Sequence, residues 1–305
     1  MIAPEWLWIP VTIGAALAQT GRNAAQRHLT PIVGTLGATL VRFLYGLPFA
    51  LLWLGIVALV GRFQLPPPTA PFGWWIAVSS LAQIAATALL LRVMAERNFA
   101  LGTAYAKTEV IQVALFGLLF LGDPLTPVTL IAIAFSMTGV MLLAPIDRKR
   151  PLRTLIAGWT TRPALLGIAS GAGFGVAAVG YRGAALALPD VPFPMAAACT
   201  LVAAQTLQTV LLGGWLLAWK SQIVVRVLRE WRKSLFAGLM GATASACWFT
   251  AMAVEPAANV RTLALIEILF GYAIARRFFR EHPSRTEVAG MLLLLVGLVV
   301  VTLAR

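Results

Sequence analysis

The chain has 305 residues, of which 60% are hydrophobic and only 11% are charged. Soluble domains carry about 25% charged residues, and the apolar residues here form runs of about 20, the length an α-helix needs to cross a bilayer. The sequence therefore predicts an integral membrane protein and excludes an ordinary soluble domain. The net charge of +13 does not indicate nucleic-acid binding, because the basic residues cluster between apolar runs, as in cytosolic loops.

Ten apolar runs, separated by proline, glycine and charged residues, predict ten membrane-spanning helices. In chain order they cover roughly 5–26, 33–60, 72–95, 99–121, 126–144, 164–187, 192–219, 235–255, 258–279 and 286–304. The first run contains Ala16-Leu17-Ala18, which resembles a signal-peptidase site, but no basic segment precedes it. We therefore expect this segment to be retained as the first membrane helix.

The link between the seventh and eighth runs, residues 220–234, has a helical pattern of its own. Val224, Val227, Leu228 and Trp231 follow the spacing of one helix face, and arginine and lysine occupy much of the rest. This pattern predicts an amphipathic helix in the membrane interface. A solvated linker is the alternative.

Few residues suit metal or nucleotide chemistry. Cys199 and Cys247 fall inside apolar runs, which does not indicate a disulfide or a metal site. The two histidines, His28 and His282, lie near the ends of predicted helices, and the chain has no phosphate loop of the GxxxxGKS or GxxxxGKT type. We therefore expect no cofactor and no ATP hydrolysis on this chain.

The two halves of the sequence resemble each other at their ends. With one constant offset of 158, the segments from 109 and from 267 align without a gap over about thirty residues. The offset pairs Glu109 with Glu267, Phe120 with Phe278, Asp123 with Glu281, Thr126 with Ser284 and Gly139 with Gly297. We therefore divide the chain into a first five-helix repeat (1–146), a basic linker (147–163) and a second five-helix repeat (164–305). Because five is odd, the second repeat is expected to be inverted in the membrane.

The distribution of charge predicts the orientation. Most lysines and arginines lie at one set of alternating loops: near Arg27 and Arg97, in 148–162, in 220–233 and in 276–285. The positive-inside rule places these loops in the cytosol and both termini outside.

The motif that closes each half resembles the end of an EamA domain of the drug/metabolite transporter (DMT) superfamily. Its features are an apolar helix, a turn with an acid and a small polar residue, and a final helix with a central glycine; here these are Gly122, Asp123, Thr126 and Gly139. Resemblance to this family, and to its YddG-type amino acid exporters, implies an all-α protein with ten helices around a central cavity. It also implies a secondary transporter of the inner membrane. Many members carry a proline in the middle of the fourth and ninth helices, where this chain has Lys107–Glu109 and Leu265–Glu267.

Polar residues inside the predicted spans are the candidate site. Glu109 and Glu267 each lie roughly 14–15 Å into their helices, near the midplane, and Arg42 and Lys107 are nearly as deep. Arg22 and Arg92 are nearer the ends, from which they can snorkel to water. The further candidates for a polar cavity are Gln19, Asn23, Gln83, Tyr105, Gln112, Tyr181 and Trp248.

Such a cavity suits a zwitterionic amino acid, with its carboxylate on lysine or arginine and its ammonium on glutamate. A buried glutamate could also exchange a proton and couple export to the proton gradient. The structural alternative is that these charges form buried ion pairs, such as Glu109 with Arg42 or Arg22, and that the aromatic residues only pack. Asp123 and Glu281 are interpreted as structural turn acids or helix caps.

Other functions stay open at this point. Exporters of drugs, quaternary cations or nucleotide-type metabolites fit the same architecture, and a channel or a membrane-embedded enzyme are further alternatives. The expected partners are a small-molecule substrate, the lipid bilayer and protons as the coupling ion, without nucleic acid.

Overall fold

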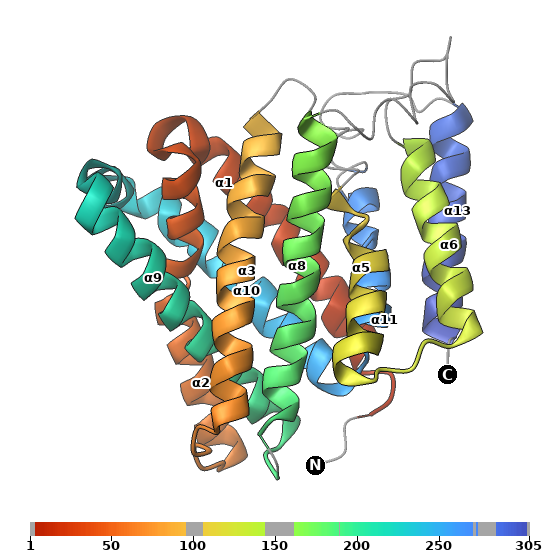
Figure 1. Cartoon of the computed structure of the whole chain (residues 1–305), viewed down its shortest axis with the longest axis horizontal. Coiled ribbons are helices and arrows are strands. Elements are labelled where there is room, and N and C mark those ends of the chain that lie inside the picture. The colour runs from red at the N-terminus through yellow and green to blue at the C-terminus, as the bar shows by residue number, and fades with distance from the viewer. Residues whose placement is uncertain are drawn as a thin grey trace.

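The computed structural model of the chain describes residues 4–95, 106–143, 162–188, 190–270, 273 and 285–303. Regular structure in this part is entirely helical (Figure 1). The helices are α1 (Trp8–Leu44), α2 (Leu47–Gly61), α3 (Ala70–Ala95), α5 (Glu109–Phe116) with the π-helical turn η1 (Gly117–Leu121), α6 (Pro127–Leu143), α8 (Arg162–Leu186), α9 (Phe193–Arg229), α10 (Trp231–Val254), α11 (Ala257–Leu263) and α13 (Arg285–Leu303).

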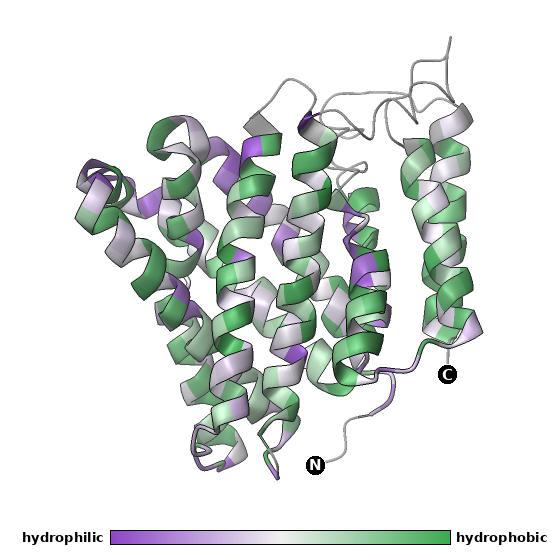
Figure 2. Cartoon of the chain, in the orientation of Figure 1, coloured by the Kyte–Doolittle hydropathy of each residue, from purple (hydrophilic) through white to green (hydrophobic). Residues whose placement is uncertain are grey.

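Several of these helices have the length and composition of membrane spans. Within the described residues, five helical stretches are long and apolar enough to cross a bilayer: 8–61, 70–93, 164–186, 193–229 and 231–254. Shorter apolar helices cover 109–121, 127–142 and 288–303. Hydrophobic residues extend along most of each helix, whereas the upper end of α5 is hydrophilic (Figure 2). The fold is thus an all-helical, multi-pass membrane protein, and the exact count of ten spans stays a prediction.

The first two predicted spans, 5–26 and 33–60, leave residues 27–32 as a loop, and the structure differs there. α1 stays helical through this stretch and turns at Gly34, whose φ of +76° and ψ of 169° are open to glycine but strained for other residues. The second span, predicted as one helix over 33–60, is interrupted at Tyr45–Gly46, before α2 begins with Pro48 in its first turn. Proline lacks the N–H that a continuous helix would need there.

The helices pack in pairs that join the two halves of the chain. α1 packs along α10, α3 along α8, and α6 along α13. In the last pair a Cβ on Gly139 would lie 2.6 Å from the carbonyl oxygen of Gly290 and from the nitrogen of Leu294. A Cβ on Gly297 would lie 2.7 Å from the nitrogen of Ser136 and 2.8 Å from the carbonyl oxygen of Ala132. The two glycines singled out by the repeat therefore let the backbones of α6 and α13 approach closely.

The predicted amphipathic segment continues α9 after a sharp bend. Lys220 has φ −146° and ψ 47°, and the helix then runs on to Arg229 in a new direction. Val224 and Val227 are buried, Leu228 and Trp231 are about half exposed, and the remaining positions are mostly exposed. The helical prediction is confirmed for 221–229, with an apolar face narrower than expected.

The ends of the described chain lie on one side of the bundle. In Figure 1 the start of α1 and the end of α13 are both at the lower side, which fits an even number of membrane crossings. The end of α6, the start of α8, the α9–α10 junction and the start of α13 are all at the upper side. The basic links predicted to be cytosolic are therefore attached to one side of the bundle, and which side faces the cytosol stays a prediction.

Candidate functional site

A cavity of about 340 Å³ lies between the two halves of the chain. Its walls come from α1, α3, α5, α8, α10, α11 and the segment after α11. Nine of the predicted site residues line it: Gln19, Asn23, Arg42, Gln83, Lys107, Glu109, Tyr181, Trp248 and Glu267. Gln112 does not line it; its amide oxygen lies against α8 near Gly171 and has no hydrogen-bond partner among the described residues. Tyr105 lies outside the described residues.

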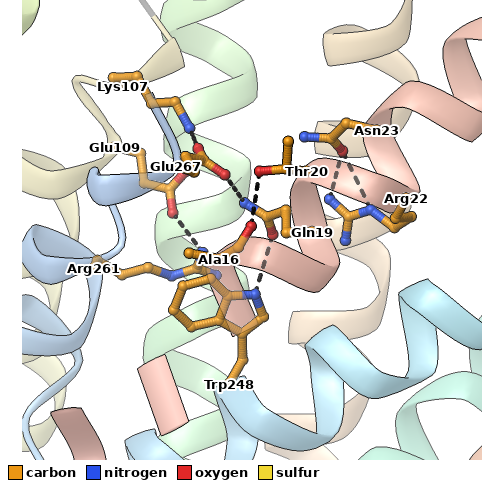
Figure 3. Close-up of polar contacts among 10 residues, drawn as sticks. All are labelled: Ala16, Gln19, Thr20, Arg22, Asn23, Lys107, Glu109, Trp248, Arg261 and Glu267. Carbon is orange, nitrogen blue, oxygen red and sulfur yellow. Dashed lines mark hydrogen bonds and ion pairs between the residues drawn. The ribbon is translucent and has the colours of Figure 1, made fainter. Parts of the chain in front are cut away.

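One ion pair joins Lys107 of the first half to Glu267 of the second half. Lys107 Nζ contacts Glu267 Oε1, and the other carboxylate oxygen accepts a 2.7 Å hydrogen bond from Gln19 Nε2 (Figure 3). Glu267 is 9% exposed, so its charge is compensated inside the protein and not by solvent.

A second ion pair also joins the halves, but here the acid comes from the first half and the base from the second. Glu109 Oε1 of the first half lies 3.2 Å from Arg261 Nη1 of the second half. The Arg261 guanidinium carbon lies 4.8 Å from the centre of the Trp248 ring, at cation–π distance. Trp248 Nε1 in turn donates to Gln19 Oε1 at 3.1 Å, so Gln19 connects the two ion pairs (Figure 3).

Both glutamates follow a tight turn in the backbone. Before Glu109, Lys107 and Thr108 form a turn, and Val110 N–H donates to the Lys107 carbonyl. Before Glu267, Ala264 and Leu265 form a turn, and Ile268 N–H donates to the Leu265 carbonyl. These i→i−3 bonds are tighter than those of an α-helix and often mark a functional hinge. The two hydrogen bonds are 158 residues apart, the offset of the sequence repeat, while the turns themselves are 157 residues apart. The turn at 264–265 interrupts the predicted ninth span, which is therefore a broken helix.

Two further arginines, Arg22 and Arg42, face the cavity and form no ion pair with an acidic residue in the described part of the chain. Arg22 Nε and Nη2 donate to Asn23 Oδ1, and its buried Nη1 has no hydrogen-bond partner among the described residues. Arg42 Nη1 donates to Thr87 Oγ1 at 3.1 Å. Both side chains are almost completely buried, with exposed fractions of 3% and 4%. Among its described residues the cavity wall holds four basic side chains and two glutamates.

The expected ion pairs were therefore partly wrong. Glu109 pairs with Arg261 and not with Arg42 or Arg22, and Arg22 is buried instead of reaching water from a helix end. Arg261 lines the cavity but is absent from the predicted site, because it lies near the start of the predicted ninth span and not near its middle. Its signal was its position inside an apolar run, six residues before Glu267.

The aromatic candidates take part in polar contacts as well as in packing. Tyr181 Oη accepts a 2.8 Å hydrogen bond from Gln208 Nε2, which also lies 3.2 Å from Gln83 Oε1. The Tyr181 ring packs on Phe249 with 4.5 Å between ring centres. Tyr181 and Trp248 thus hold neighbouring polar groups in place while they line the cavity.

Asp123 lies outside the cavity and has a structural partner. Its carboxylate accepts three hydrogen bonds from the Arg182 guanidinium, at 2.9–3.1 Å. Arg182 also donates to the carbonyl oxygens of Met252 and Glu255. This pair ties the turn after η1 to α8 and to the end of α10, in agreement with the interpretation of Asp123 as a structural turn acid. Glu281 lies outside the described residues.

Comparison with known proteins finds a similarity between the second half of the chain and one transporter family. Residues 161–303 match the model of the EamA-like transporter family. An uncharacterized transporter in the cobO 3' region of a Sinorhizobium species is 33% identical over 90 residues, which are 29% of this chain and 64% of that protein. The chain therefore spans about two thirds of the length of that relative, and the relative's name specifies no substrate.

The fold of the whole chain also has a counterpart among solved structures. A protein crystal structure matches with a TM-score of 0.65 over 97% of this chain and 96% of that chain, at 15% sequence identity. This similarity concerns the fold alone. Residues 161–303 are therefore similar to the EamA-like transporter family, and the fold of the whole chain is shared with a solved structure.

Proposed function

We propose that this protein is a secondary transporter that exports small metabolites, with amino acids as the favoured substrates, across the inner membrane by alternating access. The observation that carries the proposal is a pair of ion pairs, each of which joins the first half of the chain to the second. Lys107 with Glu267 and Glu109 with Arg261 each join one residue from either half across the cavity wall. Movement of one half against the other must break or re-form these pairs, so they fit a gate around a substrate site.

Paired contacts between the halves support an inverted repeat. Gly139 packs on positions 290 and 294, and Gly297 packs on positions 132 and 136. Adding 158 to 132, 136 and 139 gives 290, 294 and 297, so the two sets of contacts are the same contacts exchanged between the repeats. Such reciprocal contacts are what a two-fold axis produces. An axis in the membrane plane relates the halves of many transporters and passes near their substrate site.

The helix breaks support the same proposal. Broken membrane helices at matching positions of two repeats are typical of transporter binding sites. The tight turns at 107–108 and 264–265 match to within one residue of the repeat offset, and each is followed within two residues by a glutamate that lines the cavity. These turns occupy the positions at which many EamA members carry a proline.

The charges of the cavity favour a substrate with a carboxylate over a cationic drug or a quaternary amine. Four basic residues against two glutamates make the wall repel a cation, since both glutamates are already paired. An enzyme is disfavoured because the described wall residues include no histidine or cysteine to act as a base or nucleophile. Proton coupling through Glu109 or Glu267 remains part of the proposal.

Counterflow in proteoliposomes tests the proposal. Purified protein is reconstituted, loaded with one unlabelled amino acid at a time, and assayed for uptake of the same labelled amino acid with and without a pH gradient. We expect exchange for at least one amino acid and faster net export when protons can enter. Exchange of no amino acid in the panel would refute the substrate assignment.

A matched variant tests the role of Glu109 in the same assay. Glu109→Gln removes the charge that Arg261 faces, and we expect the dependence of transport on pH between about 5 and 8 to change if this carboxylate carries the proton. Glu230→Gln is the control, because Glu230 pairs with Lys233 at the half-exposed α9–α10 junction, away from the cavity. An unchanged pH profile for Glu109→Gln would assign this residue a structural role only.

A further inference from the structure

Arg22 and Arg42, the cavity arginines that form no ion pair among the described residues, come from the two arms of α1. The helix reverses at Gly34, and Gln26 Nε2 from the first arm donates to the Ala38 carbonyl of the second arm at 2.7 Å. Positions 26 and 38 are equally far from the midpoint of this hairpin, as are positions 22 and 42. The fold-back therefore brings Arg22 and Arg42 to the same level of the bundle.

The glycine on the facing helix shows that the two side chains are neighbours. A Cβ on Gly241 of α10 would lie 3.4 Å from Arg22 Cδ and 3.5 Å from Arg42 Cγ. Both guanidinium groups thus extend past the same point of α10, and both line the cavity. In Figure 3, Arg22 and Asn23 form a group of their own, separate from the two glutamates.

This arrangement is costly for the protein alone. Two like charges lie together, almost fully buried, and their hydrogen-bond partners among the described residues are the neutral groups of Asn23 and Thr87. Burying a charge that no carboxylate contacts directly is unfavourable, and one Arg22 nitrogen is left without any acceptor in the described part of the chain. A bound anion removes both costs.

We propose that Arg22 and Arg42 form the subsite that holds the carboxylate of the transported substrate. This inference rests on the proposed function and adds the chemical class of the ligand, which is a small organic anion. A guanidinium fork matches the two oxygens of a carboxylate, and both carboxylates of the protein that line the cavity are occupied by Lys107 and Arg261. Lys107 is therefore not the carboxylate ligand; its role is to neutralise Glu267.

A requirement for the carboxylate and not for the amino group follows from this assignment. Since the glutamates already have basic partners, an α-ammonium group adds little to binding. An amino acid and its deaminated acid should bind with similar affinity, and the decarboxylated amine should bind much more weakly. Leucine, 4-methylpentanoate and 3-methylbutylamine are one such set, and inorganic phosphate distinguishes carboxylate recognition from general anion binding.

Ligand-dependent thermal stabilisation of the purified protein in detergent measures this directly, because a ligand that binds the native state raises its unfolding temperature. The panel consists of several amino acids with their deaminated acids and decarboxylated amines. Arg22→Gln and Arg42→Gln are expected to weaken binding of the acids about tenfold or more, since each loses a charged hydrogen-bond donor. Arg42→Lys keeps the charge without the fork and should be intermediate.

The control variant is Arg92→Gln, which removes an exposed arginine near the end of α3, away from the cavity, and should leave binding unchanged. Without ligand, Arg42→Gln should unfold at the same temperature as the wild type or at a higher one, whereas loss of a structural ion-pair partner would lower it. Stabilisation by the amines, by phosphate alone, or by no acid of the panel would overturn the proposal on the wild-type protein alone.

The outcome is separable from that of the transport assay. Binding of acids that depends on the arginines, without exchange in proteoliposomes, would retain the subsite and refute the transporter. Exchange of amino acids that is unaffected in Arg22→Gln and Arg42→Gln would retain the transporter and refute the subsite.

Discussion

Replacement of Arg182 by methionine leaves Asp123 buried without its cation. The carboxylate loses three hydrogen bonds from the guanidinium, and the carbonyl oxygens of Met252 and Glu255 lose one donor each. The ion-pair side chains are only 12% and 9% exposed, so water does not replace these contacts fully. Removal of one partner of a buried ion pair costs about 3–5 kcal/mol. We therefore expect the free energy of unfolding to fall by about this amount.

The assay measures the free energy of unfolding in detergent by thermal or denaturant titration. It compares the wild type with Arg182→Met, Asp123→Leu and the double variant. Because the double variant buries no uncompensated charge, it should be more stable than either single variant, and the double-mutant cycle should give a coupling energy of about 1–3 kcal/mol. Arg62→Met is the control, since Arg62 is partly exposed at the end of α2. Additive single variants, or a stable Arg182→Met, would refute the structural role of this pair.

Two further predictions concern helix packing and orientation. Gly297→Ala should weaken the α6–α13 contact by about 1–3 kcal/mol, because its Cβ would lie within 2.7–2.8 Å of backbone atoms of α6. Gly55→Ala is the control and should have no such effect, because the space around Gly55 is open. Equal melting temperatures for the two variants would contradict this prediction. A cysteine placed after Arg305, in a chain with Cys199 and Cys247 replaced by alanine, should react with an impermeant thiol reagent in intact cells, and protection from it would reject outside termini.

Much of the architecture could be predicted from the sequence. The runs at 72–95, 126–144 and 164–187 correspond to α3, α6 and α8 within two residues, because a bilayer demands long apolar helices whatever their neighbours are. The repeat also selected Glu109 and Glu267 for the cavity wall, since deeply placed charges in apolar helices need a polar surrounding.

The partners of those charges could not be predicted, because ion pairing depends on which helix faces meet. Glu109 meets Arg261 across more than 150 positions of the chain, and nothing local in either segment records this contact. The burial of Arg22 likewise depends on the reversal at Gly34, which folds the first arm of α1 against the second. If the first span were straight and ended near residue 26, Arg22 would lie close to its end and reach water.

The sequence by itself therefore determined an all-helical membrane protein with a repeated carboxylate in each half, because hydrophobic length and periodicity are local properties. Only the tertiary structure decided that Glu109 and Glu267 pair with basic residues of the opposite half. It also decided that Arg22 and Arg42 form no ion pair within the part of the chain that the structure describes. Electrostatic pairing in a low-dielectric interior is set by distances of a few ångströms between side chains from different helices, and these distances exist only once the helices have packed.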